Sequence, residues 1–382
     1  MEWKNTADVV IIGGGIIGVS TAYYLAKEGM ENIVLIEKGT ICGGSTGRCG
    51  AGIRAQWGTE MNCRLGIAAL DIFEQLDEEL GMSVGLNQGG YLLVAYNEEE
   101  FETLRKGMVL QNSLGINSRM ISLKEAREIC PGLSADDAFG FFFHGRDGHA
   151  DPFLTTFAYL EAAKKMGVTC FRHTTCTGIV VEDNVVKGVE TERGTISAPI
   201  VINCAGAYAQ FIAKMAGIDI PNWGERHEIM ITEPVAPGVC PCMLMSFSGN
   251  YYIQQRPHGS IICGMSPEGH PEDFEMKTTW NFLEEMSRTL VRLLPRTKGI
   301  RVARQWSGMY DMTPDAQPII GETDVKNFYH STGYSGHGFM LAPVAGKILA
   351  QHLAGKTPDI DFSMLDYRRF ARGEHIRESN VV

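Results

Sequence analysis

The stretch DVVIIGGGIIGVSTAYYLAKEGMENIVLIE, residues 8–37, decides the fold. It opens with a short apolar run, residues 8–12, which is typical of a strand buried on both faces of a parallel sheet. A segment of helical composition, Ile16–Lys27, follows, and a second apolar run, residues 33–36, ends at Glu37. Strand, glycine turn, helix and strand within about thirty residues predict a βαβ unit.

Three glycines with G-x-G-x-x-G spacing, Gly13, Gly15 and Gly18, join the first predicted strand to the helix. The first allows a tight turn, the second lets the backbone approach a pyrophosphate, and the third lets helix and strand pack closely. The helix N-terminus favours phosphate, and Glu37 is placed to accept hydrogen bonds from ribose hydroxyls. The stretch predicts a bound dinucleotide, NAD or FAD; the alternative is a glycine turn beside a solvated glutamate.

Length and composition limit what the rest of the chain can be. With 382 residues, 44% of them hydrophobic, the chain predicts two domains and ample room for a buried cofactor. A formal net charge of −11 argues against a nucleic-acid-binding protein. The ten cysteines lack paired CxxC spacing, so they are interpreted as reduced, mostly buried thiols, and no metal site is expected.

The N-terminus has no basic region followed by an apolar run and a cleavage site, and no stretch approaches the ~18 apolar residues of a membrane span. We therefore expect a cytoplasmic protein without a membrane span.

The remaining segments predict an α/β protein, α+β overall. Helical segments alternate with β-like ones, and a strand and glycine turn near residues 328–338 precede a last helix at about 340–353. This order predicts a Rossmann-like domain with a parallel sheet assembled from distant segments, and a discontinuous substrate domain on an antiparallel sheet. The expected division gives the cofactor domain residues 1–86, 145–222 and 318–382, and the substrate domain residues 87–144 and 223–317.

Three groups of later motifs resemble a known family. They are GGSTGRCGAGIRAQW (43–57), the pair NCAGAYA (203–209) and AGIDIP (216–221), and TPDAQPIIGE (313–322) with STGYSGHGFMLAPVAG (331–346). Together they resemble the D-amino-acid oxidase superfamily of flavoproteins, in the branch of sarcosine oxidase, glycine oxidase and the β subunits of heteromeric proline dehydrogenase and sarcosine oxidase. The resemblance spans nearly the whole chain and implies FAD, bound non-covalently.

The resemblance also implies which residues contact FAD. They come from the glycine turn, the end of the second strand, the GGST loop, a later strand, NCAG and the GHGF turn: Gly13, Gly15, Ile16, Ile17, Gly18, Glu37, Lys38, Gly44, Ser45, Thr46, Cys176, Ala205, Gly206, Gly336, His337, Gly338, Phe339 and Met340. A helix that begins near Met340 would direct its positive end to the flavin edge that becomes negative on reduction. His337 is either a donor to the flavin or a structural turn residue.

The candidate substrate-facing residues are Arg54, Tyr251, Tyr310 and His337. Arg54 matches an arginine that binds a substrate carboxylate in sarcosine oxidase relatives, and bidentate pairing suits that task; the alternative is a surface or second-layer ion pair. The family places an aromatic ring over the flavin, and strand alternation points only one of Tyr251 and Tyr252 inward. The spacing to Gly264 favours Tyr251.

Four positions depart from known oxidases. Tyr310 stands where glycine-oxidase relatives carry an arginine, while Met340 and Gly308 replace the substrate-binding lysine and flavin-tethering cysteine of monomeric sarcosine oxidase. Ile262 aligns with a lysine of oxygen-reactive members, which favours an acceptor other than oxygen. The resemblance thus implies oxidation of the C–N bond of a small amino acid or secondary amine (proline, hydroxyproline, sarcosine, glycine or an opine) by hydride transfer to flavin N5.

The pattern is most similar to β subunits of heteromeric dehydrogenases, which implies a larger FAD/NAD-type α subunit, a small iron–sulfur subunit and an FMN at a subunit interface. His149 lies in the region where sarcosine oxidase β subunits attach FMN, but it is also interpretable as a loop histidine. The alternatives are an oxidase that makes hydrogen peroxide, an electron-transfer subunit without its own substrate, and an NAD-dependent dehydrogenase.

Overall fold

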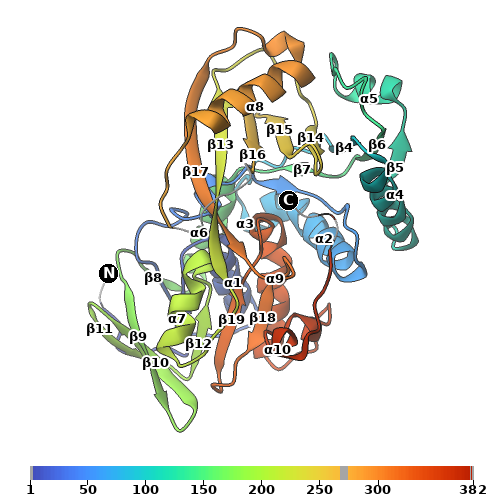
Figure 1. Ribbon diagram of the computed structural model, residues 1–382. Helices are drawn as coiled ribbons and strands as arrows, with labels where there is room; N and C mark the ends of the chain where they lie inside the picture. The colour runs from blue at the N-terminus through green and yellow to red at the C-terminus, as the bar shows by residue number, and fades with distance from the viewer. Residues whose placement is uncertain (1–2, 267–273, 379, 381–382) are drawn as a thin grey trace.

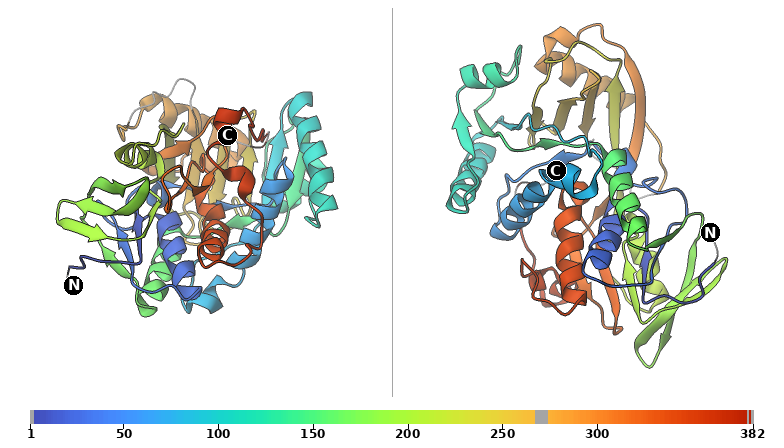
Figure 2. Two further views of the ribbon diagram at one scale, coloured as in Figure 1. Left: turned by 90° about the horizontal axis from the view of Figure 1, so that it is seen from below. Right: turned by 180° about the vertical axis from the view of Figure 1, so that it is seen from behind.

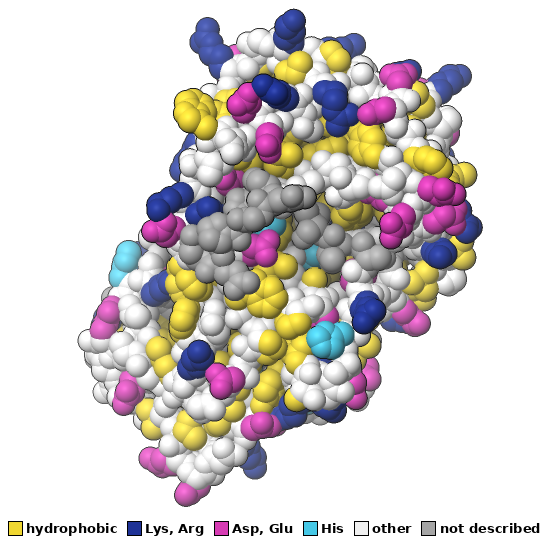
Figure 3. Space-filling view, in the orientation of Figure 1, with side chains coloured by type: hydrophobic (Ala, Val, Ile, Leu, Met, Phe, Trp, Pro, Cys, Tyr) yellow, Lys and Arg dark blue, Asp and Glu magenta, His cyan; other side chains and the backbone are white. Residues whose placement is uncertain are grey.

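The computed structural model describes residues 3–266, 274–378 and 380. Two large sheets, each covered by helices, lie at opposite ends of the molecule, and the chain passes between them several times (Figures 1 and 2). No helix among the described residues is long and apolar enough to cross a membrane. Acidic and basic side chains are interspersed on the face shown in Figure 3.

The first sheet has six strands in the order β18-β19-β12-β1-β2-β8. All its pairs are parallel except β18–β19. The strands are β1 (Val9–Ile12), β2 (Ile33–Ile36), β8 (Thr169–Phe171), β12 (Ile200–Asn203), β18 (Ile319–Glu322) and β19 (Phe328–Thr332). With α1 (Ile16–Lys27) between β1 and β2, the predicted βαβ unit is confirmed: the helix and the second strand have the expected bounds, and β1 begins at Val9, one residue later than expected.

The second sheet has eight strands in the order β17-β13-β16-β15-β14-β4-β6-β5. Every pair is antiparallel except β14–β4. Its strands are β4 (Tyr91–Ala95), β5 (Arg119–Ile121), β6 (Gly140–His144), β13 (Trp223–Thr232), β14 (Met243–Ser246), β15 (Tyr251–Gln255), β16 (Ile261–Met265) and β17 (Val302–Met312). The predicted fold class, a Rossmann-like sheet joined to a largely antiparallel one, is confirmed; the domain boundaries stay a prediction.

Smaller elements complete the fold. A three-stranded sheet contains β9 (Cys176–Glu182), β10 (Val185–Thr191) and β11 (Gly194–Ser197), and a two-stranded one contains β3 (Gly52–Ile53) and β7 (Gly148–His149). The helices after α1 are α2 (Glu60–Phe73), α3 (Leu76–Leu80), α4 (Glu98–Ser113), α5 (Leu123–Ile129), α6 (Pro152–Lys165), α7 (Ala209–Met215), α8 (Trp280–Leu293), α9 (Gly338–Leu353) and α10 (Arg369–Arg372). Residues 60–80 thus contain two consecutive helices, α2 and α3.

Helices α1 and α9 lie side by side (Figure 1). They approach closely because Gly346 faces the backbone of α1; a Cβ at Gly346 would lie 3.0 Å from the carbonyl carbon of Ser20. The Ser20 hydroxyl donates to the Ala342 carbonyl at 3.0 Å. The first and last cofactor motifs of the sequence are thereby held together.

A buried ion pair fixes the C-terminal region. Arg369 donates from Nε and Nη2 to the two carboxylate oxygens of Asp315 at 2.8 and 2.9 Å, and both side chains are buried. Although burial favours the protonated acid, the hydrogen bonds and charge of Arg369 outweigh it and lower the pKa of Asp315. This pair ties α10 to the loop that precedes β18.

Replacement of Arg369 by Met should lower the free energy of unfolding by about 3–5 kcal/mol, because it leaves the Asp315 carboxylate buried without a partner. Guanidinium unfolding at neutral pH measures the change, and Arg64→Met, in an exposed pair with Glu60, is the control with a much smaller effect. The pair stabilises above the unfolded pKa of Asp315, so the difference between wild type and variant should shrink as pH falls through the lowered folded pKa. An equal loss in both variants would contradict this role.

Candidate active site

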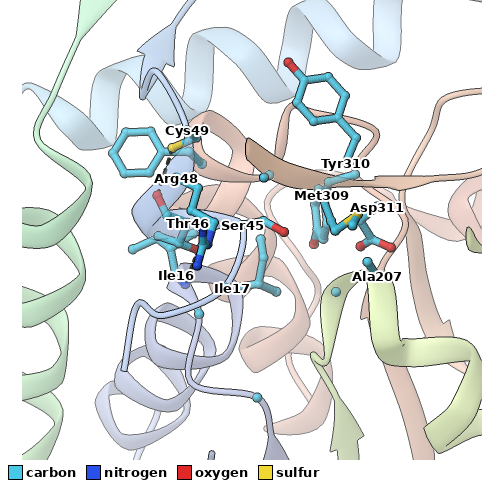
Figure 4. Close-up of a pocket in the computed structure, with 18 of the residues that line it drawn as sticks. Ile16, Ile17, Ser45, Thr46, Arg48, Cys49, Ala207, Met309, Tyr310 and Asp311 are labelled. Atoms are coloured by element: carbon cyan, nitrogen blue, oxygen red, sulfur yellow. Dashed lines mark hydrogen bonds between the residues drawn. The ribbon is translucent and has the colours of Figure 1, made fainter. Parts of the chain in front are cut away.

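One elongated cavity of about 580 Å³ runs between the two sheets. At one end lie the end of β2 and Cys176; at the other lie residues of β15, β17 and the turn before α9. In Figure 4, Ile16, Ile17, Ser45 and Thr46 line one side and Met309 and Asp311 the other. Residues that are distant in the sequence therefore share one cavity.

All but one of the predicted FAD-contacting residues line this cavity. The set is Gly13, Gly15, Ile16, Ile17, Glu37, Lys38, Gly44, Ser45, Thr46, Cys176, Ala205, Gly206, Gly336, His337, Gly338, Phe339 and Met340. The exception is Gly18, where a Cβ would lie 2.0 Å from the Gly13 carbonyl oxygen. Gly18 therefore serves the packing of α1 on the glycine turn and does not face the cavity.

The glycine turn is fixed by the residues around it. The Glu37 carboxylate accepts hydrogen bonds from the backbone N–H groups of Gly14 and Gly39, each at 2.7 Å. The Thr46 hydroxyl accepts from the Ile16 N–H at 3.1 Å, at the start of α1. Gly13 has φ +118°, and its missing side chain leaves room for the Cys204 carbonyl. The N-terminus of α1 thus opens onto the cavity, as phosphate binding requires.

The turn before α9 forms the other end of the cavity. Helix α9 starts at Gly338, two residues before the expected start at Met340, with His337 as its N-cap. Asp311 on β17 holds this turn: its carboxylate accepts from the Gly333 N–H at 2.5 Å and the Thr332 hydroxyl at 2.9 Å. Its carbonyl accepts from the Ser335 N–H at 2.7 Å.

His337 is buried against Trp57, with ring centroids 4.7 Å apart in an edge-to-face contact. Burial, followed by the positive charge of Arg54, lowers the pKa of His337 to about 3. The imidazole is therefore neutral at physiological pH. His337 both lies in the turn before α9 and lines the cavity, so the two roles considered for it do not exclude each other.

Arg54 is 1% exposed and lines the cavity, so the alternative of a surface ion pair is wrong. Its Nη1 donates to the Gln56 carbonyl at 2.9 Å, and its Nη2 donates to the Asn380 carbonyl. The guanidinium also lies 4.0 Å from the Trp57 ring centroid. These uncharged partners orient the group. Burial lowers the pKa of Arg54 and the nearby carboxylates of Glu378 and Asp147 partly offset this, but among the described residues neither is a hydrogen-bond partner of the guanidinium.

Tyr252, and not Tyr251, lines the cavity. Tyr251 is in the core of the second sheet, where its hydroxyl lies 3.0 Å from that of Tyr96. Tyr252 pairs with Gly264, and a Cβ there would lie 2.3 Å from the Tyr252 ring, so the glycine makes room for the ring. The prediction of Tyr251 was wrong because spacing along the chain does not give the register between strands.

Tyr310 lines the cavity from β17, opposite the Gly336 turn. Its ring stacks on His227 at a centroid distance of 3.6 Å and an interplanar angle of 11°. His227, in turn, contacts Glu225 through Nε2 at 3.0 Å. Burial raises the pKa of Tyr310 to about 12, so its hydroxyl stays protonated.

Several cavity residues were not predicted from the sequence. Arg48 donates to the Ser307 carbonyl at 3.0 Å, and His227 supports Tyr310; others in this group are Tyr91, Met243 and Met245. Arg48 lies within the GGSTGRCG motif, so the sequence could have indicated that it lines the cavity. The others lie on strands, where only the pairing of the sheet shows which side chains face inward.

Of the positions that depart from known oxidases, some line the cavity and one does not. Gly308 and Met340 line the cavity. Ile262 does not line it, although alternation along β16 puts it on the same face as Gly264. The meaning of Ile262 for the electron acceptor stays a prediction.

His149 is buried on β7, and it is not a loop residue. Its Nδ1 lies 3.0 Å from Arg256 Nη1, and its Nε2 lies 3.3 Å from the Asn87 amide nitrogen. Burial, and then the charge of Arg256, lowers the pKa of His149 to about 4. Attachment of a flavin at this ring would break contacts that the chain itself supplies.

The cavity fits FAD. Gly206 has φ +56°, and a Cβ there would meet no protein atom within 4 Å, which leaves open backbone beside the cavity. One end offers backbone and a carboxylate suited to ribose and phosphate, and the other offers aromatic rings and a helix N-terminus suited to a flavin. Gly13–Gly15 and the Ser45–Thr46 pair would hold the pyrophosphate, and the Gly336–Met340 turn the flavin.

Comparison with known proteins agrees with this geometry. The sarcosine oxidase subunit beta of Rhodobacter capsulatus is 28% identical, over 99% of this chain and 92% of that one. The mitochondrial dimethylglycine dehydrogenase of Rattus norvegicus is 28% identical, over 97% of this chain and 46% of the longer relative. The solved structure of L-proline dehydrogenase from P. horikoshii is 36% identical with a TM-score of 0.94, covering 98% of this chain and all of that one.

A family model described as DAO, FAD dependent oxidoreductase, matches residues 8–352. The match covers both cofactor motifs and both large sheets. The resemblance found in the sequence motifs is thereby confirmed, and the NAD-dependent alternative is wrong. The chain belongs to the DAO family of FAD-dependent oxidoreductases.

Proposed function

We propose that this protein is a dehydrogenase that oxidises the C–N bond of a small secondary amino acid, of the proline or sarcosine type. The observation that carries the proposal is the flavin end of the cavity, where Arg54, Tyr252 and Tyr310 meet the turn before α9. The similarity to an L-proline dehydrogenase, at 36% identity over nearly the whole chain, supports the substrate class.

Arg54 supplies the charge that recognises a carboxylate. Among the described residues, the hydrogen-bond acceptors of its guanidinium are the main-chain carbonyls of Gln56 and Asn380, and none is an acidic side chain. A buried guanidinium whose charge is not neutralised by a paired carboxylate is suited to an anionic substrate group. The aromatic rings of Tyr252 and Tyr310 then enclose the apolar part of a small amino acid and exclude water.

FAD, when bound, supplies the acceptor for the hydride from the carbon next to the substrate nitrogen. The protein's own contribution is binding and orientation, since holding the reacting atoms in place lowers the barrier without a catalytic base. The low pKa of His337 keeps a second positive charge away from Arg54 and the substrate. The substrate nitrogen reacts as the neutral amine, and water later hydrolyses the imine.

The electron acceptor is proposed to be a partner and not oxygen. The absence of a lysine at Ile262 supports this, and so does the name of the relative from Rhodobacter capsulatus, a subunit beta. The partner would be a larger FAD/NAD-type α subunit, with a small iron–sulfur subunit and an FMN at the interface. The second candidate is an oxidase; formation of hydrogen peroxide in air at the rate of substrate loss would favour it.

The proposal predicts that L-proline or sarcosine bleaches the flavin absorbance of the purified holoprotein under anaerobic conditions. D-proline and simple sugars serve as controls for stereochemistry and for non-specific reduction. Reduction of an artificial dye should then continue over many turnovers. If no secondary or primary amino acid bleaches the flavin, the chain has no amine substrate of its own and acts as an electron-transfer subunit.

Arg54→Met should lower kcat/KM for the amino acid roughly 10- to 100-fold, as expected when a hydrogen bond to a charged group, about 1.5–3 kcal/mol, is lost. The loss should appear mainly in KM. Pyrrolidine, which lacks the carboxylate, is the control substrate, and its kcat/KM should change little. FAD content and thermal midpoint verify that the variant is folded. An equal loss with both substrates would show that Arg54 does not bind the carboxylate.

A matched pair of tyrosines tests the corrected register. Tyr252→Leu should change the visible flavin spectrum and raise KM, because it removes a ring from the cavity. Tyr251→Leu should lower the thermal midpoint, since it leaves a hole in the core, and leave the spectrum of the folded holoprotein unchanged. The reverse pattern would place Tyr251 at the flavin.

A further inference from the structure

Three cysteines from two distant segments meet inside the second sheet's core. The Sγ atoms of Cys130, Cys240 and Cys242 all lie within 4.8 Å of one another. Their exposed fractions are 0%, 0% and 1%. In the described part of the chain, no other set of three or more His, Cys, Asp or Glu residues brings its ligand atoms this close.

Both segments are fixed by the backbone. Cys130 ends α5, where its N–H donates to the Ala126 carbonyl at 2.8 Å. Cys240 and Cys242 flank Pro241 just before β14, and the Gln255 side chain accepts from the Cys240 N–H at 3.3 Å. The Pro241 carbonyl is packed against Gly89, where a Cβ would lie 1.9 Å from it. The positions of the three sulfur atoms are therefore fixed by the end of α5 and by the loop before β14.

The chemistry of this cluster differs from that of the FAD cavity. Its possible ligand atoms are all sulfur, its neighbours are apolar core residues, and none of the three cysteines lines the cavity. Thiolates select thiophilic ions such as Zn²⁺ and Cu⁺ over Mg²⁺ and Ca²⁺, which prefer oxygen. The C-x-C spacing at Cys240 and Cys242 lets one loop supply two ligands to one ion.

We propose that Cys130, Cys240 and Cys242 form a structural site for one thiophilic d¹⁰ ion, Zn²⁺ or Cu⁺. The three thiols bind as thiolates and release their protons to solvent, and neither the metal nor sulfur changes oxidation state. Three sulfurs complete a trigonal shell for Cu⁺. Zn²⁺ prefers four ligands, so a water molecule or the Ile253 carbonyl, which the Cys240 thiol contacts at 3.7 Å, would have to supply the fourth.

The site would add a second link between a peripheral arm, which already pairs with the second sheet through β5, and the loop before β14. The arm comprises α4, β5 and α5 and lies at the side of the molecule, next to β6 (Figures 1 and 2). A metal bound by Cys130 on the arm and by Cys240 and Cys242 beside β14 cross-links two segments more than a hundred residues apart. Such a cross-link stabilises the folded chain when the metal binds it in preference to the unfolded chain.

The test uses the full chain with its FAD, kept reduced and freed of metal by chelation. Zn²⁺ alone and Cu⁺ alone are added in separate arms under anaerobic conditions, unbound metal is removed, and elemental analysis gives metal per chain. Cys240→Ala is the test variant. Cys263→Ala is its matched control, because Cys263 is also 0% exposed in the same core but lies outside the cluster.

We expect about one equivalent of one of the two metals in wild type and in Cys263→Ala, and a small fraction of an equivalent in Cys240→Ala. The metal should raise the thermal midpoint of wild type and Cys263→Ala, but not that of Cys240→Ala. Should Cys240→Ala fail to fold, binding of one equivalent by wild type together with three sulfur ligands in the X-ray absorption spectrum of the bound metal decides the question. Absence of stoichiometric binding in both arms, equal binding by both variants, or a disulfide among the three cysteines in the freshly isolated protein would overturn the proposal.

Discussion

The close approach of α1 to α9 is the constraint on which the rest of the structure depends. Gly346 lets the two helices pack backbone to backbone, and the Ser20 hydroxyl bonds to the Ala342 carbonyl across the contact. Because the helices start at residues 16 and 338, this contact brings the N-termini of the first and last cofactor motifs to one cavity. A side chain at position 346 would separate the ends of one dinucleotide site.

The other walls of the cavity follow from this arrangement. Asp311 on β17 holds the turn that precedes α9, so the second sheet is joined to the flavin end of the site. The same strand carries Tyr310, and β15, which is separated from β17 by β13 and β16, carries Tyr252. A rigid turn with a helix N-terminus, aromatic walls and one buried guanidinium provides orientation and charge, and the oxidation chemistry belongs to FAD.

Much of the cofactor site could be predicted from the sequence because its signals are local. The strand, turn and helix of residues 9–36 depend on neighbouring residues, and so does the GHGF turn. The choice between Tyr251 and Tyr252 could not be predicted, since it depends on which of them pairs with Gly264 on the adjacent strand β16. The contact of Arg54 with the Asn380 carbonyl and the convergence of Cys130 with Cys240 join distant segments, and no spacing rule indicates either.

We propose that the cavity between the two large sheets holds one FAD without a covalent bond. Acid denaturation of the purified chain, followed by chromatography of the supernatant and the precipitate, tests it most directly. The account predicts about one FAD per chain in the supernatant and a colourless precipitate, because Gly308 leaves no cysteine thiol at the position of a flavin tether. Flavin retained by the precipitated protein, or the release of a nicotinamide dinucleotide in place of FAD, would contradict the account.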